Sequence, residues 1–394
     1  MRPVIVIPSY WAGNHAETLS PGAYDHTTDL FSEDPDLERC LASLEQVRDC
    51  PRIIVLVVCP LSATRDVRLR LDHILAAHTT LNITLVTNIE AARIAERVTE
   101  LAPHAPGEGV SLRGYGAIRN MGLAAAAILG HDAVVFLDDD EVVLGPDFME
   151  TALYALGNET RQRLPILAKS GYFYDRSGSP LADTSRAGLS QRWWTKRLEF
   201  NRWMEKALAG TRISRSNYVC GGCFALHARA FRRVAFDPFI TRGEDLDYLF
   251  NMRLQGYDVW FDNTWAVKHL PPDRGERSTR FMQNVYRWYY ERAKLSFASR
   301  QKEYCLVTPE SLMPYPGPWI SHELDERVRR TSFVRMLVSS DHVGYWRIWR
   351  SGCEEAERYA CDNAGRYLKF QSFWPSIMDG LWNDPILADL LEHA

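Results

Sequence analysis

The stretch Ala133-Val-Val-Phe-Leu-Asp138-Asp139-Asp140-Glu141 places four acidic residues directly after five apolar ones. A short, uninterrupted apolar run predicts a strand that is buried on both faces, as in a parallel sheet. The adjacent carboxylates repel one another and resist burial, so we expect a positive group beside them. Ligands of open α/β sheets bind at the carboxyl ends of strands, and Mg²⁺ and Mn²⁺ prefer oxygen ligands. The stretch therefore predicts a divalent-cation site, with a solvated acidic turn as the alternative.

Short apolar runs alternate with segments of helical spacing through the first half of the chain. The apolar runs predict strands at residues 4–7, 53–59, 83–86 and 133–137. The helical spacings predict helices at residues 37–47, 65–77 and 116–129. Strands that alternate with helices indicate parallel pairing with right-handed crossovers, and therefore an α/β fold. Residues 11–36 and 103–115 are too long for simple connections, and long loops of this kind are often functional.

The second half of the chain is less regular. Its apolar segments predict strands at residues 166–174, 218–227 and 259–261. Helical spacing predicts helices at residues 193–208 and 246–254, the second of which ends at Gly256. From residue 278 onward the pattern is mostly helical.

The composition limits which class of protein this can be. The 394 residues include 46% hydrophobic residues and carry a net charge of −4 without a long basic run, so nucleic acid is not the expected partner. Eight scattered cysteines do not indicate a disulfide framework. Only about five apolar residues precede Pro8, and no run of about 18 apolar residues occurs. We therefore expect neither a signal peptide nor a transmembrane helix, and a cytoplasmic location.

Three further segments carry side chains that could bind a ligand or take part in catalysis. A glycine-rich helix start at residues 114–116 offers free N–H groups to an anion, and Arg119 behind it can grip a phosphate or a base edge. Glu244 and Asp245 follow Gly243 at an expected helix start, where simple capping is the alternative. His269 follows a short predicted strand. Together with the aspartates, these groups indicate a site for a nucleotide sugar.

In their order along the chain, these segments resemble glycosyltransferases of the A-type fold (GT-A), and particularly family 2. The matching pieces are residues 4–8, 119–123, 138–140, 221–226, 243–247 and His269. The resemblance implies a Rossmann-like, nucleotide-diphospho-sugar transferase fold with a mixed central sheet. It covers residues 1–275 as a catalytic domain and leaves residues 276–394 as a mostly helical C-terminal extension.

The resemblance also implies a role for each matching residue. The metal, Mn²⁺ or Mg²⁺, would be held by the Asp-X-Asp motif and one histidine: Asp138, Asp140 and His269. The donor would be bound by Pro8, Tyr10, Arg119, Asn120, Asp138 and Asp139. Asp245 would be the catalytic base, and Glu244 would shape the acceptor pocket. The acceptor would lie against Gly221, Gly222 and Trp194.

The implied activity is metal-dependent transfer of a sugar, such as a hexose, from a nucleoside diphosphate to an acceptor hydroxyl. The donor is a UDP-sugar by default, with a GDP-sugar as the second choice, and Asp245 favours inversion. A retaining enzyme with the same metal site stays an alternative. So do a sugar nucleotidyltransferase, which usually carries a glycine-rich loop where this chain has Pro8-Ser-Tyr-Trp11, and a non-catalytic glycan-binding scaffold.

Two segments depart from the family pattern, and two others leave alternatives open. The segment after Pro8 and the long loop with Asp25-His26-Thr27-Thr28 are unusual, which affects recognition of the base. Aromatic residues at 193–203 suit either a sugar ring or a buried helix, and the aromatic and arginine residues of the extension suit either a membrane or partner surface or packing. The acceptor, which could be a glycan, a lipid-linked sugar or a small molecule, and the oligomeric state are not predicted.

Overall fold

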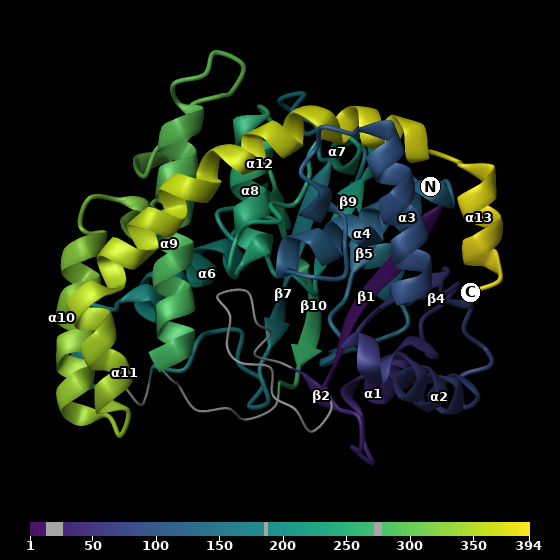
Figure 1. Cartoon of the computed structure of the whole chain (residues 1–394), viewed down its shortest axis with the longest axis horizontal. Coiled ribbons are helices and arrows are strands. Elements are labelled where there is room, and N and C mark those ends of the chain that lie inside the picture. Colours follow the sequence, from purple (N-terminus) through teal and green to yellow (C-terminus); the bar gives the residue numbers. More distant parts are fainter. Residues whose placement is uncertain (13–26, 185–187, 272–277) are drawn as a thin grey trace.

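The structure is a computed structural model that describes residues 1–12, 27–184, 188–271 and 278–394. Residues 13–26 lie outside this part, so of the predicted loop residues Asp25-His26-Thr27-Thr28 only Thr27 and Thr28 are described. Within it, a central sheet is covered by helices, and a long helix runs across the whole molecule (Figure 1). This architecture confirms the predicted α/β fold with a helical C-terminal part.

The described residues contain a sheet of ten strands in the order β4-β3-β1-β5-β9-β7-β10-β6, with β2 beside β1 and β8 beside β10. The strands are β1 (Pro3–Ala12), β2 (Thr28–Asp29), β3 (Ile53–Val58), β4 (Ile83–Val86), β5 (Ala133–Phe136), β6 (Glu141–Val143), β7 (Ala168–Tyr174), β8 (Ile213–Arg215), β9 (Phe224–His227) and β10 (Trp260–His269).

The sheet is mixed, but most of its strands point the same way. β1 pairs in parallel with β3 and β5, β3 with β4, and β7 with β10. β9 runs antiparallel between β5 and β7, and β6 runs antiparallel to β10. The ends of β1, β5 and β10 therefore lie at the same edge of the sheet, which we call the carboxyl edge.

Helices flank this sheet and continue beyond it. They are α1 (Asp36–Leu44), α2 (Thr64–Leu75), α3 (Asn88–Leu101), α4 (Tyr115–Ile128), α5 (Phe148–Leu153), α6 (Lys196–Leu208), α7 (Ala228–Phe231), α8 (Glu244–Leu254), α9 (Ser278–Ala298), α10 (Leu324–Val338), α11 (His342–Arg347), α12 (Cys353–Leu381) and α13 (Pro385–Glu392).

Helix α4 lies close to the sheet, because glycine and alanine occupy about half of its positions. Every residue from Gly116 to Ile128 is buried. A Cβ added to Gly122 would lie 2.6 Å from Val6 Cγ1 on β1. At the start of the same helix, a Cβ on Gly116 would lie 1.9 Å from the Asp237 carbonyl oxygen. These close approaches fix the first turn of α4, and with it Arg119, above the carboxyl edge.

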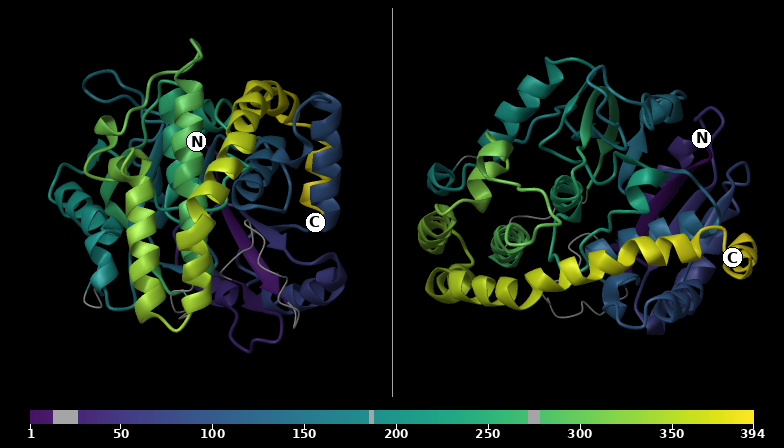
Figure 2. Two further views of the ribbon diagram at one scale, coloured as in Figure 1. Left: turned by 60° about the vertical axis from the view of Figure 1, so that its left-hand side comes forward. Right: turned by 90° about the horizontal axis from the view of Figure 1, so that it is seen from above.

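The C-terminal helices form a layer that is joined to the sheet region by α12. This helix contacts α9 and also α3 and α4, so it connects the two parts of the molecule (Figures 1 and 2). Its side chains Phe370, Trp374 and Ile377 are fully buried. Trp288, Tyr289 and Tyr290 of α9 are also buried. The aromatic residues of α9 therefore pack into the protein, whereas Trp346 and Trp349 remain about 40% and 39% exposed.

Several predicted segments differ from the structure, and β1 extends well beyond the predicted 4–7. In the segment predicted as a strand at 218–227, only β9 is a strand, because a turn from Cys220 to Cys223 bends the chain before it. The helix predicted at 193–208 begins at Lys196, after a short 3₁₀ turn. Strand β10 is much longer than the predicted 259–261 and continues to His269.

In the described part of the chain, no helix combines the length and the apolar character that are needed to cross a membrane.

Candidate functional site

The aspartate cluster lies in the tight connection between β5 and β6, at the carboxyl edge. Since β6 pairs with β10, Glu141 lies opposite His269 in the register of the two strands. The N–H of Leu270 also donates to the Asp140 carbonyl oxygen over 2.9 Å. Main-chain pairing therefore brings His269 beside Asp140, although the two residues are 129 positions apart.

Asp140 and His269 are in direct contact. The distance from His269 Nε2 to Asp140 Oδ2 is 3.2 Å, and the exposed fractions of the two side chains are 26% and 9%. Burial disfavours the charged imidazole, but the hydrogen bond to Asp140 outweighs it and raises the pKa of His269. The structure thus places a carboxylate oxygen and an imidazole nitrogen together, partly open to solvent.

Arg119 connects two of the predicted motifs. Its Nη2 donates to Asp138 Oδ1 over 2.7 Å, and its Nε donates to Glu244 Oε1 over 3.3 Å. The guanidinium is buried, and its Nη1 has no hydrogen-bond partner within the described residues. Burial alone would lower the pKa of Arg119, but Asp138 and Glu244 raise it, so the group stays charged. Arg119 therefore links the turn after β5 to the start of α8, and its Nη1 is still available to donate a hydrogen bond.

Glu244 and Asp245 form the first turn of α8, after Gly243. Gly243 has φ +71°, a left-handed conformation that favours glycine. Burial raises the pKa of Glu244 to about 7, against the opposing effect of Arg119. Asp245 is half-buried, and its carboxylate lies 3.6 Å from the point that a Cβ on Gly221 would occupy. The same point is 2.9 Å from Arg119 Nη2, so Gly221 leaves room between the acid and the arginine.

Gly222 accommodates a different carboxylate. A Cβ at this position would lie 1.8 Å from Glu141 Oε2. Glu141 is 2% exposed and accepts from the N–H of Asp138 over 3.2 Å. Burial and the neighbouring Asp138 raise its pKa well above the ordinary value. Gly222 is therefore needed for packing of Glu141 beneath the aspartate turn.

The predicted donor residues on β1 lie at the same edge. Pro8 is buried and pairs with Leu56 of β3. Ser9 Oγ donates to Asp139 Oδ2 over 2.8 Å, which turns the middle aspartate of the cluster toward β1. Burial, followed by the charge of Asp140, raises the pKa of Asp139. Tyr10 is half-buried and close enough to Arg119 to affect its pKa.

Two predicted site residues serve the packing of the protein. Asn120 is fully buried, and its side-chain N–H groups donate to the carbonyl oxygens of Gly109 and Phe236, each over 2.9 Å. Both of its N–H groups are thus used to hold loops beside α4. Trp194 is 9% exposed and packs edge-on against Phe281 and Trp319, with ring centroids 4.7 and 4.5 Å away. The ring fills the space between the sheet region and the C-terminal helices.

Within the described residues, no group of three or more His, Cys, Asp or Glu side chains is arranged to hold a metal ion. The pair Asp140 and His269 nevertheless fits a divalent cation that accepts oxygen and imidazole ligands, such as Mn²⁺. Two protein ligands suffice where phosphate oxygens and water complete the coordination. Asp138 is 35% exposed and already paired with Arg119, so it lies beside this pair without joining it.

Two residues near Asp245 were not identified from the sequence as candidate site residues. Lys196 begins α6, and Arg287 lies on α9 with Trp288 beside it. Neither belongs to a motif, and tertiary packing alone brings them to α8. One signal was available, because Arg287, Glu291 and Lys294 follow the i, i+4, i+7 spacing of one helix face among aromatic residues.

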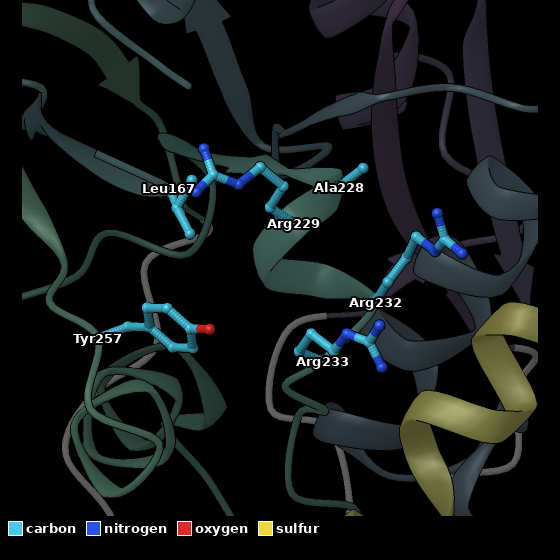
Figure 3. Close-up of a pocket in the computed structure, with 6 residues that line it drawn as sticks. All are labelled: Leu167, Ala228, Arg229, Arg232, Arg233 and Tyr257. Carbon is cyan, nitrogen blue, oxygen red and sulfur yellow. The ribbon is translucent and has the colours of Figure 1, made fainter. Parts of the chain in front are cut away.

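A cavity of about 310 Å³ lies away from this site (Figure 3). It is lined by Leu167, Ala228, Arg229, Arg232, Arg233 and Tyr257. These residues cluster around His227, the last residue of β9, which pairs with Ala133 at the start of β5. Since the aspartate cluster follows the other end of β5, the cavity and the candidate site lie at opposite edges of the sheet.

Comparison with known proteins gives one family match and several similar structures. The family model described as "Glycosyltransferase like family 2" matches residues 51–291. The mannosyltransferase PcManGT from Pyrobaculum calidifontis, solved in complex with GDP-Man and Mn²⁺, is 14% identical with a TM-score of 0.46, over 97% of this chain and 88% of that one. GalNAc-T7, solved with UDP, GalNAc and Mn²⁺, is 13% identical with a TM-score of 0.42, over 76% of this chain and 51% of that one. No curated protein sequence gives a significant match.

Proposed function

This chain belongs to the glycosyltransferase-like family 2, and from that premise we propose that residues 1–275 transfer a sugar from a nucleoside diphosphate to an acceptor hydroxyl. The observation that carries the proposal is the convergence at one sheet edge of Arg119, Asp140, His269 and Asp245, which lie on four different elements or turns. A non-catalytic scaffold has no need for a buried arginine with an unused donor beside three carboxylates.

Asp245 is the proposed base. The acceptor oxygen forms a bond to the anomeric carbon while the bond from that carbon to the diphosphate breaks. The hydroxyl proton passes to the Asp245 carboxylate, and the electron pair of the broken bond leaves with the diphosphate. Asp245 is half-buried beside Gly221, so a hydroxyl can reach it. A single displacement with a dedicated base inverts the anomeric configuration, which is the outcome we propose over retention.

Arg119 and Glu244 are the proposed positioning groups around this base. The Arg119 Nη1 that has no partner in the described part of the chain is available to a diphosphate or a base edge. Its bonds to Asp138 and Glu244 fix the direction of that group before any ligand arrives. A preorganised donor of this kind costs little reorganisation when negative charge develops on the leaving group.

Asp140 and His269 are the proposed metal ligands, with Asp138 next to them. A bound Mn²⁺ or Mg²⁺ would supply positive charge to the departing diphosphate. Pro8 and Tyr10, in the second half of β1, are the proposed contacts of the nucleoside. A UDP-sugar is the default donor, with a GDP-sugar as the second choice.

The proposal is tested by measuring thermal stability with UDP, GDP and the other nucleoside diphosphates, each with and without Mn²⁺. A ligand that binds only the folded state adds roughly 2.7 kcal/mol of stability at a hundredfold excess over its dissociation constant. We expect one diphosphate to raise the melting temperature in a Mn²⁺-dependent way, and Asp140→Ala to abolish the increase.

The matched control is Asp362→Ala, an exposed carboxylate on α12, a helix that contributes no residue to the candidate site. This variant should keep the full shift. If no diphosphate stabilises the wild-type protein, or if Asp140→Ala keeps the shift, the donor site is wrongly placed and the scaffold alternative gains support.

A further inference from the structure

Two cations outside the family motifs share one aromatic ring next to the proposed base. The ring is Trp288, which is fully buried on α9. Lys196 Nζ lies 5.4 Å from the centroid of this ring, and Arg287 Cζ lies 4.7 Å from it. Lys196 is half-buried at the start of α6, and Arg287 is 5% exposed. Two helices that are remote in the sequence thus bring an ammonium and a guanidinium group together.

The guanidinium of Arg287 packs directly on the main chain that carries Asp245. A Cβ added to Gly243 would lie 1.9 Å from Arg287 Nη1 and 2.0 Å from Cζ. Gly243 immediately precedes the turn that contains Glu244 and Asp245. The absence of a side chain at Gly243 is therefore what allows this cation to approach the base.

The positive charge of this pair is only partly balanced by nearby carboxylates. Arg287 Nε donates to Glu291 Oε1 over 3.0 Å, but the buried Nη2 has no hydrogen-bond partner in the described part of the protein. Lys196 forms no hydrogen bond and no ion pair with any described residue. Leaving buried donors unpaired costs free energy, so their retention beside a reactive site points to a ligand that completes them.

The other charged groups around Lys196 are Arg242, on the loop before α8, and the carboxylates of Asp245 and Glu291. Burial, followed by repulsion from Arg287 and Arg242, lowers the pKa of Lys196 to about 7, although both carboxylates act in the opposite direction. Three cations (Lys196, Arg287 and Arg242) therefore stand against two carboxylates around this ring, which leaves an excess of positive charge. An anion placed there would favour the charged form of Lys196 and relieve the repulsion.

We propose that the acceptor carries an anionic group, a carboxylate or a phosphate, which Lys196 and Arg287 bind while its hydroxyl lies at Asp245. The inference rests on the proposed function, because the space beside Asp245 is an acceptor site only in a transferase. It narrows the acceptor to hydroxylated acids or phosphate esters, whether free or at the end of a larger molecule.

The test compares three ligands with one scaffold and different charge: glucose, glucuronate and glucose 6-phosphate. Binding of each is measured by calorimetry on the full chain with Mn²⁺ and the nucleoside diphosphate that the protein binds, and inorganic phosphate serves as a probe without a scaffold. We expect at least one of the charged ligands to bind roughly tenfold or more tightly than glucose, which is the effect of one or two hydrogen bonds to a charged group. Whether glucuronate or glucose 6-phosphate binds more tightly identifies the anion.

Variants at Lys196 test the assignment without disturbing the buried Arg287. Lys196→Gln should lose roughly tenfold or more in affinity for the charged ligand, and Lys196→Arg should keep most of it. Lys302→Gln, which removes an exposed lysine from another loop, is the matched control and should behave as wild type. Equal affinity for glucose and both charged ligands, or an unchanged Lys196→Gln, would overturn the inference.

Failure of this inference is distinguishable from failure of the proposed function. A protein that binds a nucleoside diphosphate with Mn²⁺ but no anionic ligand keeps its transferase site and loses only the anion assignment. A protein that binds no diphosphate loses the proposed function and the inference with it.

The pH dependence of glucuronate binding adds an independent measurement, because the charge of its carboxylate does not change between about pH 6 and 8. Since the pKa of Lys196 in the empty site is about 7, affinity should fall as the pH rises through this range. Binding near pH 7 should also take up a proton, seen as a dependence of the heat on the buffer. Lys196→Arg should remove both effects, and a flat profile in wild type would contradict the role of Lys196.

Discussion

Asp245 provides the sharpest test at the scale of single residues. Asp245→Asn keeps the size of the side chain but removes its ability to accept a proton, so transfer to the acceptor should slow by about 10²- to 10⁴-fold. Because the residue is half-buried and outside the Asp140–His269 pair, binding of the diphosphate with Mn²⁺ should be unchanged. Initial rates of transfer and diphosphate affinity, measured side by side, separate these effects.

Asp362→Asn serves as the control for that measurement, since it makes the same chemical change on the exposed side of α12. If Asp245→Asn keeps more than a tenth of the wild-type rate, the base lies elsewhere or the enzyme retains configuration.

Glu244 makes stability depend on pH in a predictable direction. Its ordinary pKa is 4.5, and burial raises the pKa in the folded protein to about 7 despite Arg119. Between these values the unfolded chain releases the proton while the folded protein keeps it. The contribution of Glu244 to stability is therefore complete below pH 4.5 and is lost as the pH rises toward 7.

Glu244→Gln removes this titration, so its free energy of unfolding relative to wild type should increase between pH 4.5 and 7. At about 1.4 kcal/mol per pKa unit, the change is on the order of 3 kcal/mol. Denaturant unfolding of both proteins without ligand, at several pH values, measures it. Parallel pH profiles for wild type and variant would show that Glu244 titrates normally.

The residues of the candidate site were predictable to different degrees. Asp140, His269 and Asp245 belong to short motifs, and each lies at the carboxyl edge where a strand end or a helix start was predicted. The positions of Lys196 and Arg287 depend on how α6 and α9 pack, which local spacing does not encode. Asn120 was predicted to contact the donor, but its N–H groups bind main-chain carbonyl oxygens that no motif identifies.

At the scale of elements, prediction succeeded where one apolar pattern controls the whole segment. β4 was predicted with its observed bounds, because its residues form one apolar run. β10 was predicted to be much shorter, because the polar residues Asp262, Asn263 and Thr264 resemble a turn. In the structure Asp262 is fully buried and pairs with Lys169 over 2.9 Å. A tertiary ion pair therefore keeps this polar segment within the strand.

Helix α9 is held against α8 by a buried ion network centred on Lys294. Its Nζ donates to Asp237 Oδ2 over 3.0 Å, to Asn251 Oδ1 over 2.8 Å and to Asp247. Both carboxylates are fully buried. Lys294→Met should therefore lower the free energy of unfolding by about 3–5 kcal/mol, because it leaves two buried carboxylates without their cation.

Urea unfolding of Lys294→Met and of Lys302→Met, an exposed lysine in the following loop, measures this effect. The loss should be smaller at pH 6 than at pH 8, since burial has already raised the pKa of Asp247 to about 7 and a protonated carboxyl needs no counterion. Adding Asp247→Asn should restore part of the stability. Equal stability of the two methionine variants would show that the network contributes little.

At the scale of the whole molecule, the sheet region and the C-terminal helices share buried side chains. Phe370 of α12 contacts the loop before α4 so closely that a Cβ on Gly109 would lie 2.1 Å from its ring. Trp374 Nε1 donates to the Phe231 carbonyl oxygen over 2.8 Å. The extension after the proposed boundary at residue 275 therefore contributes side chains to the core of the proposed enzyme domain.

We accordingly expect a single cooperative unfolding transition for the full chain, with calorimetric and van't Hoff enthalpies that agree. Phe370→Ala should lower the free energy of unfolding by about 3–5 kcal/mol and shift the whole transition without splitting it. Two separate transitions in differential scanning calorimetry would show that the two parts fold independently.

The route of α12 across the molecule also constrains how the protein is made. During synthesis every strand of the sheet leaves the ribosome before residues 353–381. Until α12 arrives, the surfaces of α3, α4 and α9 that it covers stay open, and the loop around Gly109 lacks the ring that packs on it. We therefore expect the nascent chain to hold a nearly complete sheet with an exposed apolar surface, which favours aggregation until α12 closes over it.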